Sequence, residues 1–124
     1  MDKSTVLIVE DEALVGLELQ EILEGLGYNV PEVISSGDAV VEGVLKYKPN
    51  LIIMDIHLRS FIDGIDAVKR IKMLDDTPVI YLTAFPNSEI KDRAMTTNPV
   101  AYLIKPFKEE ELIKYVDKAL NPGN

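Results

Sequence analysis

Polar side chains follow four short apolar runs in this sequence, at the point where each run ends. The run 51–54 is followed by Asp55, and the runs 5–9, 79–82 and 101–104 are followed by Glu10-Asp11, Thr83 and Lys105. Continuous apolar runs of this length are typical of strands covered on both faces, as in a parallel sheet. Because ligands of open parallel sheets bind at the carboxyl ends of the strands, these polar residues are candidates for one site. Loop capping would explain any one of them, but not a set with complementary chemistry.

The types of these residues point to phosphoryl chemistry assisted by a metal ion. Three carboxylates held close together repel one another unless a cation lies between them. Mg²⁺ suits such a site, because it takes oxygen ligands and keeps waters that a phosphoryl oxygen can replace. A carboxylate left partly free can then attack phosphorus. Lys105 would supply a positive charge for the phosphoryl oxygens, and Thr83 a hydroxyl donor.

Length and composition limit the classes of protein to consider. With 124 residues, 47% of them hydrophobic, we expect a single domain over residues 1–124 with no output domain. The net charge of −8 argues against direct binding to nucleic acid, which needs clustered Lys and Arg. No apolar run approaches the roughly 20 residues of a membrane span, and the first strand leaves no room for a signal peptide. The absence of cysteine fits a cytoplasmic location.

The apolar spacing predicts an alternation of strands and helices that would position these residues. Strands are predicted at 5–9, 30–34, 51–55, 79–82 and 101–104, and Pro31 favours an edge position for the second. Helices are predicted at 12–26, 39–46, 64–73, from Ser88 to about 96, and at 108–120. We expect Ser88 to cap its helix, with Glu89 and Asp92 in the first turn.

Five βα repeats predict an α/β fold with a three-layer sandwich. Right-handed crossovers leave few topologies for five parallel strands. One of them, the flavodoxin-like order 2-1-3-4-5, places the first and third strands side by side. In that order Glu10, Asp11 and Asp55 would be neighbours.

The sequence resembles the receiver domain of two-component response regulators over essentially its whole length. The motifs that carry the resemblance are Glu10-Asp11, Met54-Asp55, Asp63-Gly64, Thr83-Ala84, Tyr102 and Lys105-Pro106-Phe107. Each motif alone is weak, but the ordered set at the expected spacings is specific. The resemblance implies a CheY-like, flavodoxin-like (βα)5 fold of order 2-1-3-4-5. It also implies a phosphorylation-dependent signalling switch rather than an enzyme that turns over a substrate.

The resemblance implies a role for each matching residue. Asp55 would be the phosphoacceptor, and Thr83 and Lys105 would hold the phosphoryl group. Mg²⁺ would be bound by Glu10, Asp11, Asp55 and the backbone carbonyl of His57, whose side chain we expect to be an ordinary loop side chain. Tyr102 would be the aromatic switch residue, turning inward as Thr83 moves toward the phosphoryl group. A cis peptide at Lys105-Pro106 would cost little.

The partners implied by the resemblance are a sensor histidine kinase or histidine phosphotransfer protein and a downstream output protein or domain. The surface made by the helix from Ser88, the strand 101–104 and the helix 108–120 would change shape on phosphorylation. A homodimer through that surface is compatible with the resemblance.

Two segments depart from the usual receiver pattern. The loop 56–63 lacks the proline that often follows the phosphoacceptor and is a residue longer, so we expect Phe61 and Ile62 to be exposed. Asn98-Pro99-Val100 replaces the small, glycine-containing turn before the last strand. Neither change alters the five residues whose side chains form the predicted site, which are Glu10, Asp11, Asp55, Thr83 and Lys105.

Three other functions fit this sequence less well than a receiver. A haloacid-dehalogenase-type phosphatase needs a second acid two residues after the nucleophile, where this sequence has His57. A flavodoxin needs a Ser-, Thr- and Gly-rich phosphate loop, whereas Glu10-Asp11-Glu12 would repel a phosphate that lacks a metal. The remaining alternative is a degenerate receiver that docks partners without being phosphorylated, against which the complete set of site residues argues.

Overall fold

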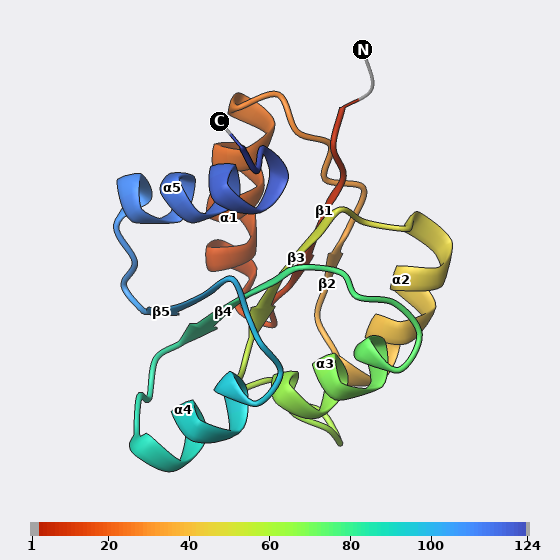
Figure 1. Ribbon diagram of the computed structural model, residues 1–124, viewed down its shortest axis with the longest axis vertical. Helices are drawn as coiled ribbons and strands as arrows, with labels where there is room; N and C mark the ends of the chain where they lie inside the picture. The colour runs from red at the N-terminus through yellow and green to blue at the C-terminus, as the bar shows by residue number, and fades with distance from the viewer. Residues whose placement is uncertain (1–2, 124) are drawn as a thin grey trace.

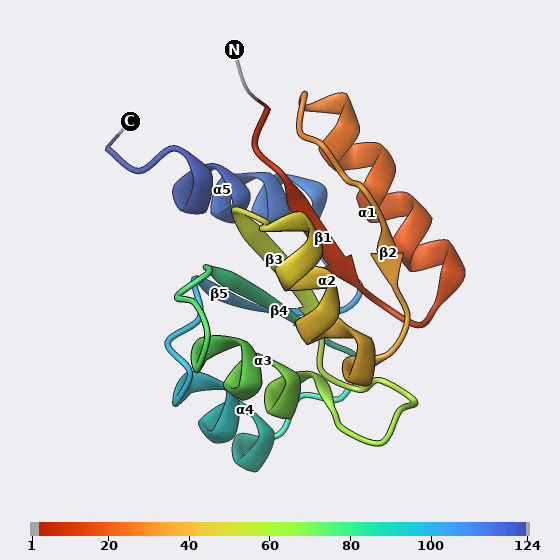
Figure 2. The same cartoon turned by 90° about the vertical axis from the view of Figure 1, so that its right-hand side faces the viewer.

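The computed structural model describes residues 3–123 and has three layers (Figures 1 and 2). A central sheet is covered on one face by two helices, α1 and α5, and on the other by α2, α3 and α4. The chain alternates between strand and helix from end to end, as the sequence predicted.

All five strands are parallel, and their order is β2-β1-β3-β4-β5. The strands are β1 (Val6–Val9), β2 (Val33–Ile34), β3 (Leu51–Asp55), β4 (Val79–Thr83) and β5 (Ala101–Ile104). This is the predicted 2-1-3-4-5 order, and β3 is the central strand. Val9 pairs with Met54, so β1 and β3 end at the same level of the sheet.

The helices follow the predicted segments closely. They are α1 (Ala13–Gly25), α2 (Val40–Tyr47), α3 (Gly64–Lys72), α4 (Ser88–Met95) and α5 (Glu109–Leu120), and a short 3-10 turn, η1 (Gly37–Ala39), leads into α2. Among residues 3–123, no helix is both long enough and apolar enough to span a membrane.

The sheet separates two apolar cores because successive strand residues face opposite sides. Leu7, Ile52 and Tyr81 face the layer of α2, α3 and α4. Ile8, Ile53 and Ile80 face α1 and α5. On α3, the predicted face of Ile65, Val68 and Ile71 is fully buried. Each such side chain contributes about 1.5–3 kcal/mol by leaving water, so burial of this face holds α3 against the sheet.

Three local predictions were wrong. Asn87 caps α4, because its Oδ1 accepts a hydrogen bond of 2.9 Å from the backbone N–H of Ile90, and Ser88 is the first helical residue. Asp92 consequently lies beyond the first turn. β2 is shorter than predicted and begins after Pro31, although it is the predicted edge strand.

The loop between β3 and α3 is only partly as predicted. Phe61 is 94% exposed, as expected, but Ile62 is 6% exposed and packs in the core beneath α2 and α3. The Ser60 hydroxyl donates to the carbonyl of Ile62 at 2.8 Å and accepts from Gly37 N–H at 3.0 Å. Asp38 accepts a hydrogen bond from Phe61 N–H at 3.2 Å. The loop is therefore anchored to η1, and this anchoring directs Ile62 inward.

Candidate functional site

The carboxyl ends of β1 and β3 bring three carboxylates together. Glu10 and Asp11 follow β1, and Asp55 is the last residue of β3. One carboxylate oxygen from each lies within 4.8 Å of the other two, and among residues 3–123 this is the one cluster of three acidic or other metal-binding side chains. Glu10 and Asp55 are each 2% exposed, whereas Asp11 is half-buried. The sheet order thus produces the acidic group that strand adjacency predicted.

Lys105 follows β5 and reaches across the sheet edge to this cluster. Its Nζ lies 2.8 Å from Glu10 Oε1, 3.6 Å from Asp55 Oδ2 and 3.5 Å from Glu12 Oε1. The Lys105–Pro106 peptide is cis, as the sequence suggested. Burial alone would lower the pKa of Lys105, but the contact with Glu10 and the negative charges around it raise the pKa overall. The lysine is therefore held as a cation beside the carboxylates.

Burial disfavours the charged form of the Glu10 carboxylate. Burial raises the pKa of Glu10 to about 7, while Lys105 and the backbone N–H of Glu12 oppose the rise and Asp55 adds to it. Glu12 N–H donates to Glu10 Oε2 at 3.0 Å. A buried carboxylate with such a pKa gains stability from any cation that approaches it.

The β3–α3 loop orients the other two carboxylates. The backbone N–H of Arg59 donates to Asp11 Oδ2 at 2.8 Å, and that of His57 donates to Asp55 Oδ1 at 3.1 Å. Gly64, at the start of α3, packs against the backbone of Asp55 so closely that a Cβ at this position would lie 2.2 Å from the Asp55 carbonyl oxygen. Glycine is required here for close approach of the helix to the strand end.

Thr83 ends β4 next to Asp55, because Asp55 pairs with Leu82 across the sheet. Its hydroxyl is buried and accepts a hydrogen bond of 3.2 Å from Phe85 N–H. The same hydroxyl lies 3.1 Å from His57 Nε2. The imidazole also meets the Phe85 ring edge-on, with 5.3 Å between ring centroids.

The contact between His57 and Thr83 is a feature of the candidate site that sequence reasoning missed. The expectation for His57 was an ordinary loop side chain. His57 lies two residues after Asp55, the last residue of β3, and β3 is the neighbour of β4. This position in the sequence could have indicated a contact with Thr83. Only the tertiary structure shows that the imidazole reaches that hydroxyl.

Tyr102 lies on β5 and pairs in register with Tyr81 of β4. Its ring is half-buried, and Lys91 Nζ of α4 lies 6.0 Å from the ring centroid. Its hydroxyl is buried and makes no hydrogen bond within the part of the chain that the structure describes. Burial raises the pKa of Tyr102, and the nearby Thr83 opposes that rise. Thr83 and Tyr102 are thus neighbours on adjacent strands.

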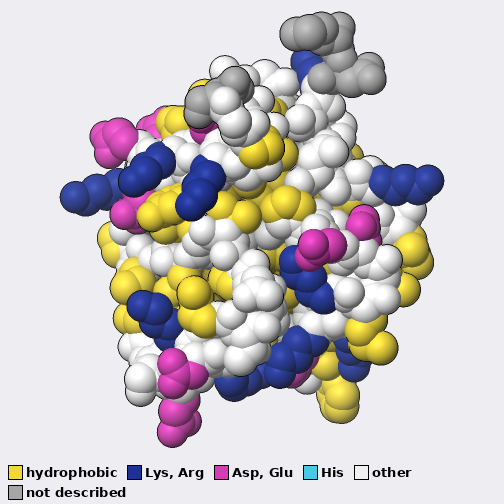
Figure 3. Space-filling model, viewed as in Figure 1, with side chains coloured by type: hydrophobic (Ala, Val, Ile, Leu, Met, Phe, Trp, Pro, Cys, Tyr) yellow, Lys and Arg dark blue, Asp and Glu magenta, His cyan; other side chains and the backbone are white. Residues whose placement is uncertain are grey.

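The donor set fits a hard divalent cation. Three carboxylates at one sheet edge supply oxygen ligands only, which suits Mg²⁺ better than metals that prefer nitrogen or sulfur. The buried Glu10 charge would be neutralised by such an ion. Lysine and arginine side chains, by contrast, are spread over the face shown in Figure 3, and several lie beside acidic ones.

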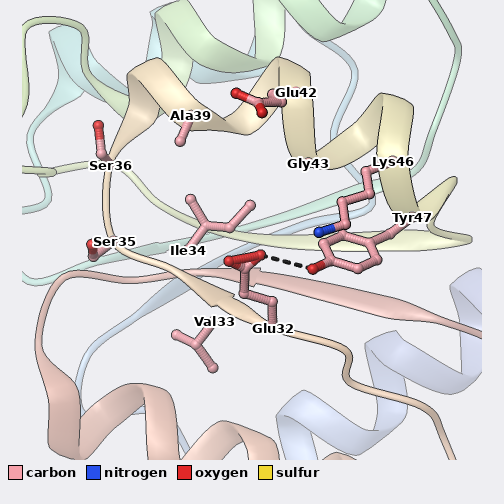
Figure 4. Close-up of a pocket in the computed structure, with 10 residues that line it drawn as sticks. All are labelled: Glu32, Val33, Ile34, Ser35, Ser36, Ala39, Glu42, Gly43, Lys46 and Tyr47. Carbon is pink, nitrogen blue, oxygen red and sulfur yellow. Dashed lines mark hydrogen bonds between the residues drawn. The ribbon is translucent and has the colours of Figure 1, made fainter.

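A separate pocket of about 300 Å³ lies between β2 and α2 and contains none of these residues (Figure 4). The Tyr47 hydroxyl donates to Glu32 Oε2 at 3.0 Å, and Lys46 lies above the Tyr47 ring. The pocket is therefore not part of the acidic site.

Comparison with known proteins agrees with this geometry. The family model described as "Response regulator receiver domain" matches residues 6–117. The chain is 38% identical over 116 residues to the transcriptional regulatory protein PdtaR of Mycobacterium tuberculosis, covering 94% of this chain and 56% of PdtaR. It is 29% identical to the chemotaxis protein CheY of Bacillus subtilis, covering 94% of this chain and 97% of CheY.

The fold is also similar to solved structures. The signal receiver domain of a modulated diguanylate cyclase from Desulfovibrio desulfuricans G20 superposes with a TM-score of 0.89 at 33% identity, covering 96% of this chain and 94% of that one. The chain spans about half the length of PdtaR, so the comparison with that protein concerns one of its parts. The family match covers most of the chain, and the chain therefore belongs to the response regulator receiver domains of two-component signalling systems.

Proposed function

We propose that this receiver accepts a phosphoryl group on Asp55 in a Mg²⁺-dependent reaction and changes conformation in response. The observation that carries the proposal is the convergence of Asp55 with Glu10, Asp11 and Lys105 at one edge of the sheet. Glu10, Asp11, Asp55 and the carbonyl of His57 would hold Mg²⁺. When bound, the ion would neutralise charge on the carboxylates and on the phosphoryl oxygens.

The residues of the chain have distinct tasks in the proposed reaction. An Asp55 carboxylate oxygen attacks the phosphorus of a phosphohistidine, the P–N bond breaks, and its electron pair returns to the imidazole of the donor. The His57 N–H fixes the rotation of the Asp55 carboxylate. Lys105, 3.6 Å from Asp55 Oδ2, balances the charge of the transferred group, and Thr83 donates a hydrogen bond to it.

The proposed switch couples Thr83 to Tyr102. Movement of Thr83 toward the phosphoryl group changes the surroundings of Tyr102, whose buried hydroxyl has no hydrogen bond among residues 3–123. A new position of this side chain would alter the surface of α4, β5 and α5. A beryllofluoride-bound structure in which Tyr102 and α4 keep their present positions would contradict this part of the proposal.

Receiver domains interact with histidine kinases and output domains and are generally not classical enzymes. For this chain we propose a sensor histidine kinase or histidine phosphotransfer protein as phosphoryl donor and an output protein or domain as target. Residues 1–124 would form one receiver domain. Its α4-β5-α5 surface would serve the output and a homodimer.

The proposal is tested by intact-protein mass spectrometry after incubation with acetyl phosphate and Mg²⁺. The wild-type protein should gain one phosphoryl group. The Asp55→Asn variant and a wild-type sample with EDTA should gain none. If the wild type binds Mg²⁺ but gains no mass, the domain is a phosphorylation-independent docking domain, which is the alternative that the intact site disfavours.

A further inference from the structure

We propose that the His57 imidazole holds the hydroxyl proton of Thr83 in the unphosphorylated protein and competes for it with the incoming phosphoryl group. His57 would thereby be a positioning residue that acts through Thr83 and sets how readily Thr83 donates a hydrogen bond to the phosphoryl group. This inference rests on the proposed function of Asp55 and deepens it.

The first step concerns the hydrogen bonds that one hydroxyl can make. A threonine hydroxyl has one proton to donate and can accept from neighbouring donors. Thr83 Oγ1 already accepts from Phe85 N–H at 3.2 Å, and His57 Nε2 lies 3.1 Å away. Donation from Thr83 to an unprotonated Nε2 completes this set, because the hydroxyl then accepts one hydrogen bond and donates one.

The Thr83 hydroxyl can donate its single proton to only one acceptor at a time. Thr83 is fully buried, so the hydroxyl cannot exchange its partner for bulk water. In the proposed reaction Thr83 must donate to a phosphoryl oxygen on Asp55. The bond to His57 must therefore break when the bond to the phosphoryl group forms, and the imidazole opposes this rearrangement by the strength of one hydrogen bond.

His57 contacts both the phosphoacceptor Asp55 and Thr83. Its backbone N–H donates to Asp55 Oδ1 at 3.1 Å while its ring reaches Thr83. The ring is seated edge-on against Phe85, with 5.3 Å between centroids. The residue therefore spans the ends of β3 and β4, and its ring position depends on the same loop that orients the phosphoacceptor.

The first measurement is the tautomer of the imidazole, read from its ¹⁵N chemical shifts in the full chain under conditions where the ring is neutral. His57 is the only histidine in the sequence, so the signals need no assignment to a residue, and couplings to the ring protons distinguish Nε2 from Nδ1. The proposal expects an unprotonated Nε2 whose shift moves in Thr83→Val. A protonated Nε2 would mean that the ring donates to Thr83 and would overturn the proposal, whether or not Asp55 is phosphorylated.

The second measurement is the affinity for beryllofluoride with saturating Mg²⁺, followed by ¹⁹F NMR. His57→Phe keeps a ring against Phe85 but removes the acceptor, and it should bind roughly two- to tenfold more tightly than wild type. His57→Gln places an acceptor near the Nε2 position and should behave like wild type. His57→Asn is too short to reach Thr83 and should resemble His57→Phe.

The same comparison in a Thr83→Val background shows whether His57 acts through Thr83. There, the gain from His57→Phe should disappear. Weaker binding by His57→Phe, or an equal gain with and without the Thr83 hydroxyl, would overturn the proposal. Failure of wild type to bind beryllofluoride would instead contradict the proposed function of Asp55, and the tautomer measurement would still decide the hydrogen bond.

Discussion

At the scale of single residues, the site is dominated by a buried charge that the fold does not fully compensate. Glu10 is 2% exposed and has Lys105 Nζ at 2.8 Å, yet burial raises the pKa of Glu10 to about 7. A group with such a pKa makes the stability of the domain depend on pH.

We expect the free energy of unfolding, measured in EDTA, to fall as the pH rises from 5 to 8 because of Glu10. The pKa of Glu10 is raised from 4.5 to about 7, so the folded protein keeps a proton there that the unfolded chain has lost. The stability contributed by protonated Glu10 is complete below 4.5 and is lost as pH rises through about 7. Glu10→Gln should remove this loss, which we expect to be about 2–3 kcal/mol between pH 5 and 8.

The test is urea unfolding of both proteins at several pH values. The difference in unfolding free energy, Glu10→Gln minus wild type, should grow in favour of the variant toward pH 8. Titrating groups that do not contact Glu10 are common to both proteins and cancel. A difference that does not change with pH would show that Glu10 is ionised as easily in the folded as in the unfolded chain.

Gly64 is the residue at which a single methyl group should disturb the site most. An added Cβ would lie 2.2 Å from the Asp55 carbonyl oxygen, so Gly64→Ala must displace α3 or the end of β3. We expect a loss of about 2–4 kcal/mol in unfolding free energy and slower phosphorylation of Asp55. Gly25→Ala is the matched control, because nothing lies within 4 Å of its Cβ position. That control should be neutral or stabilising by less than about 1 kcal/mol.

At the scale of secondary structure, α4 is the helix least supported by the core. Ala94 is its only buried residue, and Ile90 is half-buried. Arg93 links the helix to α3 through Asp63 at 3.1 Å and Asp66 at 3.4 Å, but all three side chains are at least 32% exposed. Exposed ion pairs contribute about 0–1 kcal/mol each. Local interactions within α4 therefore carry much of its stability.

The capping interaction of α4 can be tested with two neighbouring substitutions. Asn87→Ala removes the acceptor for Ile90 N–H and should cost about 1 kcal/mol, together with faster amide hydrogen exchange over 88–95. Ser88→Ala leaves that acceptor in place and should change the free energy of unfolding by less than about 0.5 kcal/mol. A larger effect at Ser88 than at Asn87 would restore the capping assignment that the sequence suggested.

At the scale of the whole molecule, three of the 21 acidic residues, Glu10, Asp11 and Asp55, meet at one edge of the sheet. A cation bound there stabilises only the folded chain, because the carboxylates come from the ends of two strands, β1 and β3, that are distant in the sequence. Ligand binding of this kind raises stability by mass action.

We expect Mg²⁺ at ten times its dissociation constant to stabilise the domain by about 1.4 kcal/mol, raising the melting temperature by roughly 3–6 °C. Differential scanning calorimetry at constant ionic strength separates this effect from general screening. Asp11→Asn should abolish most of the shift. Asp92→Asn removes the same charge from an exposed position on α4 and should keep the shift in full. Equal shifts in both variants would place the ion elsewhere.

The sequence alone determined the main features of this protein, because its apolar periodicity and motif spacing are local properties. The runs that became β1, β3, β4 and β5, the start of α3 at Gly64 and the polar residues at the strand ends were all read from residue order. Given parallel strands in the predicted order, the proximity of Glu10, Asp11 and Asp55 followed.

Only the tertiary structure decided which side chains meet across the loops. The burial of Ile62 depends on the anchoring of its loop by Ser60 and Asp38, and the contact of His57 with Thr83 depends on the path of the chain after β3. No periodic pattern encodes either arrangement. Loop side chains are placed by contacts between residues that are distant in the sequence. These contacts form only when the helices and strands have packed together.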